Sequence, residues 1–524
     1  MELGLITSGA ALASVESQLP QLIEDRVGSR IAAKDATLWG PEAESEASIR
    51  LGWVSPFEAA EALVPQILAL REELLAEGLD RVVLCGMGGS SLAPEVIAAN
   101  DGVDLVIFDT TDPQAAARIV GTDLERTVVV VSSKSGSTVE TDSQRRAFTS
   151  AFNAAGIDPA TRLVLVTDPG SPMDNPDGVR AVFNADPNVG GRYSALTAFG
   201  LVPSGLAGAD IQALVEEAGL IADLLATDDE DNLALHLGAA MATVGRDKLL
   251  IAGLPGSLPG FADWAEQLIA ESTGKLGKGV LPVALGPDAP ELREPAADTL
   301  PLYIHAELPE ELDEEATAIH VSAPLGTSFM LFEYATAVAG RLLGINPFDQ
   351  PDVEAAKAAA RSLLDAPAAG TPDAVDGSVE LYGTSARTLS EALRTLTSKL
   401  ADDGYLAIQA YLDREQDAEL LALRDALAAA TGRPVTFGWG PRFLHSTGQY
   451  HKGGPRQGVF LQLTGDASED LPIEGRPFSF GGLITAQASG DAAVLTDAEH
   501  ARPLLRVHLT DRAAGIAALL QAAG

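Results

Sequence analysis

The most regular feature of the chain is a series of short apolar runs, each followed by a stretch with helical spacing. Four of these runs occur early, at residues 81–86, 104–109, 127–131 and 162–166. Apolar runs without alternation are typical of strands that helices cover on both faces, as in parallel sheets. Because a helical stretch follows each run, the pattern predicts consecutive strand-helix units in a doubly wound sheet.

Similar runs continue through the rest of the chain. A second set begins near 248–253, continues at 318–323 and includes a long apolar helix around 328–344. A Pro/Gly/Ala-rich stretch at 367–377 then separates a third segment, in which helical and strand patterns also alternate. The sequence therefore predicts an α/β chain with two doubly wound parallel-sheet domains, at 51–235 and 236–366, and a C-terminal α/β segment at 378–524.

The first 50 residues have a different pattern. Leu19, Leu22, Ile23 and Val27 share one helical face. We expect residues 1–50 to form a helical extension that packs against the first sheet.

Composition excludes several classes of partner. The 524 residues carry a formal net charge of −39, which disfavours nucleic acid and anionic membranes. The chain has neither an apolar run long enough for a bilayer nor the basic start of a secretory signal. The single cysteine, Cys85, allows no internal disulfide. These features predict a cytoplasmic protein.

A loop rich in hydroxyl side chains follows the strand at 127–131 and opens a helix. Free N–H groups in a first helical turn attract anions, and Gly136 allows the backbone to approach a ligand closely. The loop is therefore predicted to bind the phosphate group of a small molecule. The alternative is an ordinary loop that caps the helix. Its donors are Ser133, Ser135, Ser137 and Thr138, with Lys134 as a cation beside them.

A glycine-rich loop follows the first strand, with Gly86, Gly88, Gly89 and Ser90 in succession. It is similar to a dinucleotide fingerprint, but Ser91 replaces the third glycine and no acidic residue clearly marks a ribose-binding strand, so we do not expect NAD. The loop suits a single phosphate or a sugar hydroxyl, and the alternative is a structural tight turn.

An arginine follows a pair of glycines. Gly190 and Gly191 bring Arg192 to the start of an apolar helix, which we expect Ser194 to cap. A permanently charged guanidinium could stabilise developing negative charge at that place. The alternative is an ordinary surface arginine.

A carboxylate lies near the end of the next helical pattern. Gln267 and Glu271 are four residues apart and share a face, and Glu271 falls in the last turn before Gly274. Glu271 is therefore a candidate general base, and the alternative is a solvated carboxylate.

The remaining candidates are split between two segments. Gln350 precedes Pro351, which begins a predicted helix, and Lys357 falls almost two turns into it. His445 lies in a polar, glycine-rich loop after a predicted strand, and His451 in the same loop is its rival. Histidines and carboxylates show no spacing typical of a metal site, so we expect neither a metal nor another cofactor.

Taken in order, these segments resemble the glucose-6-phosphate isomerase family, whose fold has two sugar-isomerase (SIS) domains. GMGGS is similar to the family's GIGGS loop, SKSGSTVET to its SKTFTTQET phosphate loop, and GGRYS to its arginine loop. QLIAESTGK resembles its glutamate segment, and FDQPDVEAAK its FDQ segment with a following lysine. The similar segments span about residues 86–357.

The resemblance implies a role for each matching residue in the interconversion of glucose 6-phosphate and fructose 6-phosphate. Glu271 would move a proton between C1 and C2, and Arg192 would stabilise the cis-enediolate. Lys357 and a histidine, His445, would assist ring opening. The residues that would bind the substrate are Gly89, Ser90, Ser133, Lys134, Ser135, Thr138, Gly191, Gln267 and Gln350.

One departure from the family pattern concerns the histidine. The shorter bacterial form carries HSMGQY before its FDQ segment, whereas the similar HSTGQY with His445 follows Lys357 here. This order resembles the long form that also occurs fused to transaldolase. It leaves open whether His445 serves its own subunit or a homodimer partner, and whether His451 replaces it.

Two other functions compete with this interpretation. A related isomerase could also accept mannose 6-phosphate. A noncatalytic SIS-type sugar-phosphate sensor would need the hydroxyl loops but not Glu271, Arg192 or Lys357. The acidic charge and the lack of a basic helix-turn-helix pattern count against such a sensor.

Overall fold

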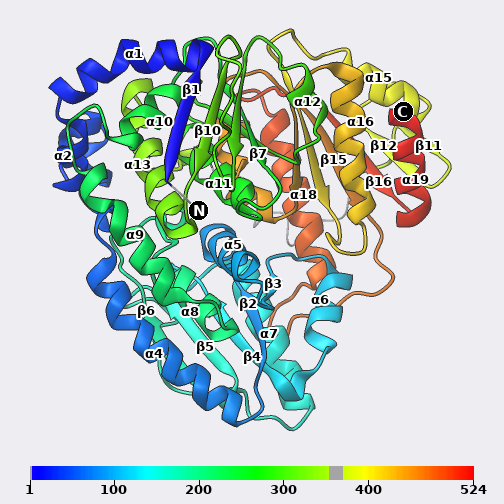
Figure 1. Cartoon of the computed structure of the whole chain (residues 1–524). Helices are drawn as coiled ribbons and strands as arrows, with labels where there is room; N and C mark the ends of the chain where they lie inside the picture. Colours follow the sequence, from blue (N-terminus) through cyan, green and yellow to red (C-terminus); the bar gives the residue numbers. More distant parts are fainter. Residues whose placement is uncertain (1–2, 353–369) are drawn as a thin grey trace.

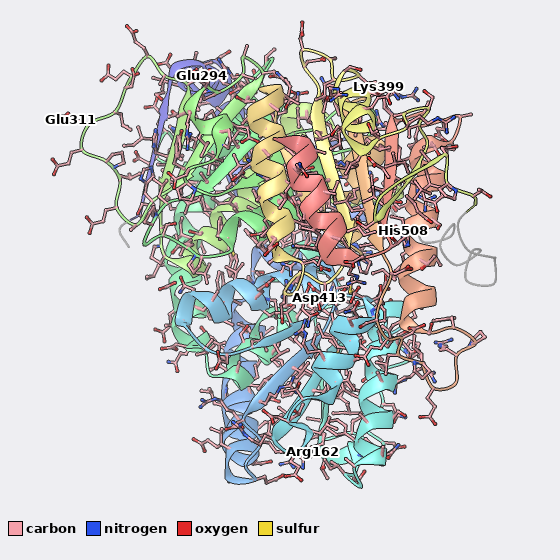
Figure 2. All side chains as sticks on the ribbon, turned by 90° about the vertical axis from the view of Figure 1, so that its right-hand side faces the viewer. Arg162, Glu294, Glu311, Lys399, Asp413 and His508 are labelled. Carbon is pink, nitrogen blue, oxygen red and sulfur yellow. The ribbon has the colours of Figure 1, made fainter. Side chains whose placement is uncertain are left out.

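A computed structural model describes residues 3–352 and 370–524 and shows three sheets in that part of the chain (Figure 1). The first sheet and its helices form the lower part of the molecule in both views, and the second and third sheets lie above it (Figures 1 and 2). Lys357 lies outside the described residues.

The first sheet is parallel, with strand order β3-β2-β4-β5-β6. Its strands are β2 (Arg81–Cys85), β3 (Val106–Phe108), β4 (Thr127–Ser132), β5 (Leu163–Thr167) and β6 (Ala181–Asn184). Every residue of β4 is buried, and fully burying one valine side chain stabilises the fold by roughly 1.5–3 kcal/mol. The four strands predicted for this region are confirmed.

Successive residues of these strands face two different helix layers. Val128 and Val130 pack in the core that includes α4 (Phe57–Ala76), α5 (Leu92–Asp101) and α8 (Ala198–Ala207). Val129 and Val131 pack in the core of α6 (Pro113–Gly121) and α7 (Val139–Ala154). Helices thus cover both faces, as the unbroken apolar runs predicted.

The second sheet has the order β1-β10-β9-β7-β8. Its parallel strands are β7 (Lys248–Gly253), β8 (Leu281–Leu285), β9 (Thr299–Ile304) and β10 (Ala318–Ser322). Its core includes residues of α1 (Gly9–Glu24), α9 (Ile211–Leu225), α10 (Leu233–Met241), α11 (Phe261–Thr273) and α13 (Leu325–Leu343).

The N-terminal segment differs from the expected helical extension. Residues Gly4–Ser8 form β1, which pairs antiparallel with β10, so the segment belongs to the second sheet and not to the first. An apolar and β-branched run at a free sheet edge satisfies backbone donors and acceptors that would otherwise face solvent. The helical part follows as α1, with α2 at Val27–Ala32 and α3 at Glu44–Ala47.

The third sheet is mixed, with the order β11-β12-β16-β15-β13-β14. The strands are β11 (Ala374–Asp376), β12 (Val379–Tyr382), β13 (Tyr405–Tyr411), β14 (Val435–Trp439), β15 (Gly458–Gly465) and β16 (Leu504–Leu509). β12 pairs antiparallel with both β11 and β16. The neighbouring strands from β16 to β14 pair parallel. The further helices are α12 (Pro290–Arg293), α15 (Leu389–Thr397), α16 (Leu421–Thr431), α17 (Gly448–Gly453), α18 (Phe480–Thr496) and α19 (Arg512–Ala523).

The third segment packs tightly against the other two. Tyr405 and Phe460 share a core cluster with Leu281 and Val283 of β8. Asp413 lies where the third segment meets the first sheet (Figure 2), and both of its oxygens accept from Nη2 of Arg118 at 3.0 Å. No helix within the described ranges is long and apolar enough to cross a membrane. The domain boundaries proposed from the sequence stay a prediction.

Candidate active site

A cavity of about 580 Å³ lies where the carboxyl ends of β2 and β4 meet the end of α11 and a loop of the third segment. All the predicted site residues that the structure describes line it, although they come from widely separated parts of the chain. They are Gly89, Ser90, Ser133, Lys134, Ser135, Thr138, Gly191, Arg192, Gln267, Glu271, Gln350 and His445.

The hydroxyl loop connects β4 to α7 at one end of the cavity. Thr138 is the N-cap residue of α7, but its side chain makes no cap bond and instead accepts a hydrogen bond from Oγ of Ser133 at 3.1 Å. Gly136 has a φ of +64°, which favours glycine. These hydroxyls and the first-turn N–H groups of α7 converge, as a bound anion requires.

Lys134 is less available than the sequence suggested. Its Nζ lies 2.6 Å from Oδ2 of Asp168 and donates to the carbonyl of Pro187 at 3.1 Å. The lysine charge is therefore partly balanced within the protein. Neutral hydroxyl and amide donors, rather than a free cation, dominate this end of the cavity.

Close backbone packing joins the glycine-rich loop to two other parts of the site. A Cβ on Gly88 would lie 2.8 Å from Nε2 of Gln267 and 2.9 Å from Cβ of His445, and its φ is +55°. A Cβ on Gly89 would lie 1.9 Å from the carbonyl oxygen of Gly191. Any larger residue would separate these segments, so the glycines set the spacing of the site.

Arg192 and Glu271 form a buried pair at the centre of the cavity. Nη1 of Arg192 lies 3.5 Å from Oε2 of Glu271, and the arginine side chain is 3% exposed. Nη1 also donates to Oε1 of Gln350 at 2.8 Å, and Nε donates to Oγ of Ser272 at 2.8 Å. The guanidinium is thus held rigidly beside the carboxylate.

The turn before this helix differs from expectation in one detail. Ser194 does not cap α8, because Thr197 is the N-cap residue and its side chain accepts from the backbone N–H of Phe199. Ser194 instead donates to the carbonyl of Gly191 at 2.6 Å. Arg192 lies in a short 3₁₀ turn, Gly191–Tyr193, which precedes the helix and was not evident from the apolar pattern.

His445 reaches the cavity on a loop of the third segment. It ends a 3₁₀ turn, Arg442–His445, and its backbone carbonyl accepts from Nε2 of Gln267 at 2.6 Å. Its Nε2 lies 3.3 Å from Oε1 of Glu140, which also accepts from Nε2 of Gln487 at 2.7 Å. The imidazole is therefore oriented by a buried carboxylate.

His451 occupies a different environment. It is buried, its Nδ1 lies 3.0 Å from the hydroxyl of Tyr405, and it lies outside the cavity. Burial, with Lys452 and Arg502 nearby, holds its pKa well below the ordinary value. The structure thus brings His445, and not its rival, to the cavity.

Several charged and polar residues of the site were missed from the sequence. Arg50, Glu140 and Gln487 line the cavity, and Lys275 lies outside its lining. Nζ of Lys275 donates to the carbonyls of Asn346 and Asp349 at 2.7 and 2.6 Å, which holds the loop before Gln350 in place. Glu140 and Lys275 lie within SKSGSTVET and QLIAESTGK, so the quoted motifs contained them, whereas no local signal marked Gln487.

The arrangement can surround one small polar molecule with a carboxylate, a guanidinium, an imidazole and a set of hydroxyl donors. Among residues 3–352 and 370–524, no group of three or more His, Cys, Asp or Glu side chains is placed to hold a metal ion. Such an arrangement can support proton transfer beside a fixed cation.

The chain is similar to known proteins in sequence and in fold. Residues 75–279 match the family described as phosphoglucose isomerase, a range that contains Glu271 and Arg192 but not His445. A glucose-6-phosphate isomerase from Rippkaea orientalis is 38% identical over 216 residues, which cover 38% of this chain and 41% of that protein. The aligned part thus spans less than half the length of that relative.

Two other matches are more extensive. A glucose-6-phosphate isomerase from Rubrobacter xylanophilus is 30% identical over 366 residues, covering 55% of this chain and 84% of that protein. The crystal structure of a glucose-6-phosphate isomerase from Chlamydia trachomatis shares the fold, with a TM-score of 0.52 and 20% identity over 65% of this chain and 78% of that one. Because the match to the Rubrobacter xylanophilus protein covers more than two thirds of that relative at 30% identity, the chain belongs to the glucose-6-phosphate isomerase family.

Proposed function

We propose that this chain interconverts glucose 6-phosphate and fructose 6-phosphate by proton transfer through a cis-enediolate. The observation that carries the proposal is the buried pair of Glu271 and Arg192, 3.5 Å apart, in the same cavity as the hydroxyl loop. A sensor that only binds a sugar phosphate would need the loop but not the pair. The pair therefore supports catalysis.

The hydroxyl loop would hold the phosphate, which does not react. Ser133, Ser135 and Thr138 donate to its oxygens, and the first turn of α7 adds backbone N–H donors. Binding energy from this remote group positions C1 and C2 against Glu271, which lowers the entropic part of the barrier.

His445 would open the sugar ring, together with Lys357 of the family motif. Ring opening breaks the bond between C1 and the ring oxygen, moves a proton onto that oxygen and removes the proton of the C1 hydroxyl. The contact with Glu140 supports this role, because it fixes the imidazole's orientation.

Glu271 would then carry the proton between the two carbons. Its carboxylate takes the proton from C2 of the open aldose and returns it to C1, while the hydroxyl proton on O2 is lost and O1 gains one, so that C2 becomes the carbonyl carbon of a ketose. Negative charge accumulates on the enediolate oxygens in between, and the guanidinium of Arg192, held by Ser272, would stabilise that charge. The scheme uses side chains alone, and we place the protein in the cytoplasm, where its substrate would be a soluble sugar phosphate.

Isomerisation in deuterated water tests the function directly. If Glu271 exchanges its proton with solvent, fructose 6-phosphate formed from glucose 6-phosphate will carry deuterium at C1, detectable by NMR. The control is the Glu271→Gln variant, which should form no labelled product. Binding of the sugar phosphate without turnover by the unmodified chain would establish a sensor instead.

A further inference from the structure

The loop that carries His445 belongs to the third segment, whereas the other described residues of the proton-transfer site belong to the first two sheets. Glu271 and Arg192 lie on or near α11 and α8, and the hydroxyl loop follows β4. The imidazole's position relative to the substrate therefore depends on contacts between segments. Local helix or strand geometry does not supply them.

Arg442 makes two of these contacts. Its Nη1 donates to Oδ2 of Asp109 at 2.9 Å, and its Nη2 donates to Oε2 of Glu95. Asp109 directly follows β3 and Glu95 lies on α5, so one guanidinium joins the histidine loop to two elements of the first sheet. The Arg442 side chain is 13% exposed and that of Asp109 is 2% exposed.

The same contacts lead back to the substrate loop. Oγ of Ser91 donates to Oδ2 of Asp109 at 3.0 Å, and Ser91 follows Ser90 in the glycine-rich loop. Asp109 thus holds both the histidine loop and the loop that lines the cavity with Ser90 and Gly89. A displacement of Arg442 would therefore shift both loops.

The connection between Arg442 and His445 is short and stiff. The two residues begin and end one 3₁₀ turn, and between them Phe443 is buried against the ring of Tyr411, with ring centroids 5.5 Å apart. At the other end of the turn, Gln267 holds the carbonyl of His445 at 2.6 Å. The turn that carries the imidazole is thus held at both of its ends.

We propose that Arg442 is a positioning residue, which sets the place of His445 by anchoring its loop to Asp109 and Glu95. Arg442 lies outside the cavity lining, so it acts through His445 and not on the substrate. The inference rests on the proposed function, in which His445 opens the ring. A lysine cannot replace this arginine fully, because a single ammonium lacks the planar fork that reaches two carboxylates.

Arg433 offers a matched control. Its Nη2 donates to Oδ2 of Asp298 at 2.6 Å, its Nε donates to the carbonyl of Gly404 at 2.9 Å, and its side chain is 12% exposed. It therefore joins the third segment to the second sheet by the same kind of ion pair, before β14 and outside the cavity lining. Loss of either arginine should weaken the packing of the third segment, but only Arg442 adjoins the histidine loop.

The test is a double-mutant cycle on the full chain. Arg442→Ala, Arg442→Lys and Arg433→Ala are each made in the unmodified chain and in a His445→Ala background. The measured quantities are kcat/KM for glucose 6-phosphate, corrected for the folded fraction, and Tm. Arg442→Ala should lower kcat/KM about 10- to 100-fold alone but less than about twofold when His445 is absent, since residues that act as a unit are not additive. Arg442→Lys should lie between, and Arg433→Ala should change Tm alone.

Either of two results for the arginine variants would overturn the inference. One is an equal loss of kcat/KM from the Arg442 variants in both backgrounds, which would show that Arg442 acts independently of His445. The other is an equal loss from Arg433→Ala, which would reduce Arg442 to general stability. If Arg442→Ala does not fold, Arg442→Lys carries the same cycle. A His445→Ala variant with full activity would instead remove the proposed role of His445, and the inference with it.

Discussion

The two ends of the cavity are built in opposite ways. At the phosphate end, the donors come from one continuous loop between β4 and α7, and their arrangement follows from the strand-to-helix turn. At the histidine end, Glu140, Gln267 and His445 come from three segments separated by more than a hundred residues, and they meet only through tertiary contacts.

In the proposed function, the phosphate end binds the substrate and the histidine end takes part in the reaction. A local loop can be read from the sequence, and single hydroxyls in it should contribute separately to affinity. The histidine end depends on the packing of the third segment, so its residues should act as a unit. The variants that follow test this contrast, beginning with the proton carrier that both ends serve.

The largest effect should come from Glu271→Gln. The amide keeps the shape of the carboxylate but cannot accept a proton, so kcat should fall about 10²- to 10⁴-fold while substrate binding persists. A dehydrogenase-coupled assay measures kcat, and calorimetry measures binding. Glu333→Gln is the control, because burial raises the pKa of Glu333 well above its ordinary value and an amide resembles its neutral form. Turnover near that of the unmodified chain in Glu271→Gln would remove it from the base role.

His445→Ala should have the next largest effect, and only where a ring must open. We expect kcat/KM for cyclic glucose 6-phosphate to fall about 100-fold, as typical for loss of a general acid or base. An open-chain analogue should lose much less, because its ring-opening step is absent. Steady-state kinetics with both compounds checks this, and equal losses would contradict the ring-opening role.

Ser133→Ala and Thr138→Ala should each lower kcat/KM about tenfold, since a hydrogen bond to a charged group contributes about 1.5–3 kcal/mol and water replaces part of it. In the double variant, the two losses in kcat/KM should add if the hydrogen bond between these hydroxyls contributes little to substrate binding. Ser137→Ala is the control, because Ser137 lines the cavity but has no assigned phosphate contact. An equally large loss of kcat/KM in Ser137→Ala would contradict this assignment, because it would mean that Ser137 also contacts the phosphate.

His451→Gln should have the smallest effect on activity and a clear effect on acid stability. Burial holds the pKa of His451 well below its ordinary value of 6.5. As pH falls through 6.5 the unfolded chain gains a proton that the folded chain does not, so stability is lost toward acid, by up to about 1.4 kcal/mol per pH unit. Denaturant titrations at pH 7 and 5 should show this loss in the unmodified chain and less of it in His451→Gln.

Much of the fold follows from the order of apolar runs. Fully buried strands such as β4 and β13 have few polar residues to break the pattern, so they could be placed from the sequence. Short or edge strands carry less signal. The residues of β1 were expected to be helical. The pairing that makes them a strand is with β10, more than three hundred residues away, so it cannot be seen in the local sequence.

The site divides along the same line. Arg192 and Glu271 could be identified because each lies beside a local marker, a glycine pair or a helix end, within a recognisable motif. Gln487 could not, because its contact with Glu140 joins α18 to α7 across nearly 350 residues. Lys134 looked like a free cation, since nothing near it in sequence reveals that Asp168 pairs with it.

By itself, the sequence determined the class of the fold and picked out the hydroxyl loop, Glu271 and Arg192 as candidates that line one cavity. These depend on contiguous residues whose backbone conformation is largely local. Only the tertiary structure decided which histidine reaches the cavity and what holds it there. His445 ends a 3₁₀ turn, and His451 lies in α17 just after it. Their positions diverge because Arg442, Gln267 and Gly88 direct His445 into the cavity, while Tyr405 and the third sheet bury His451.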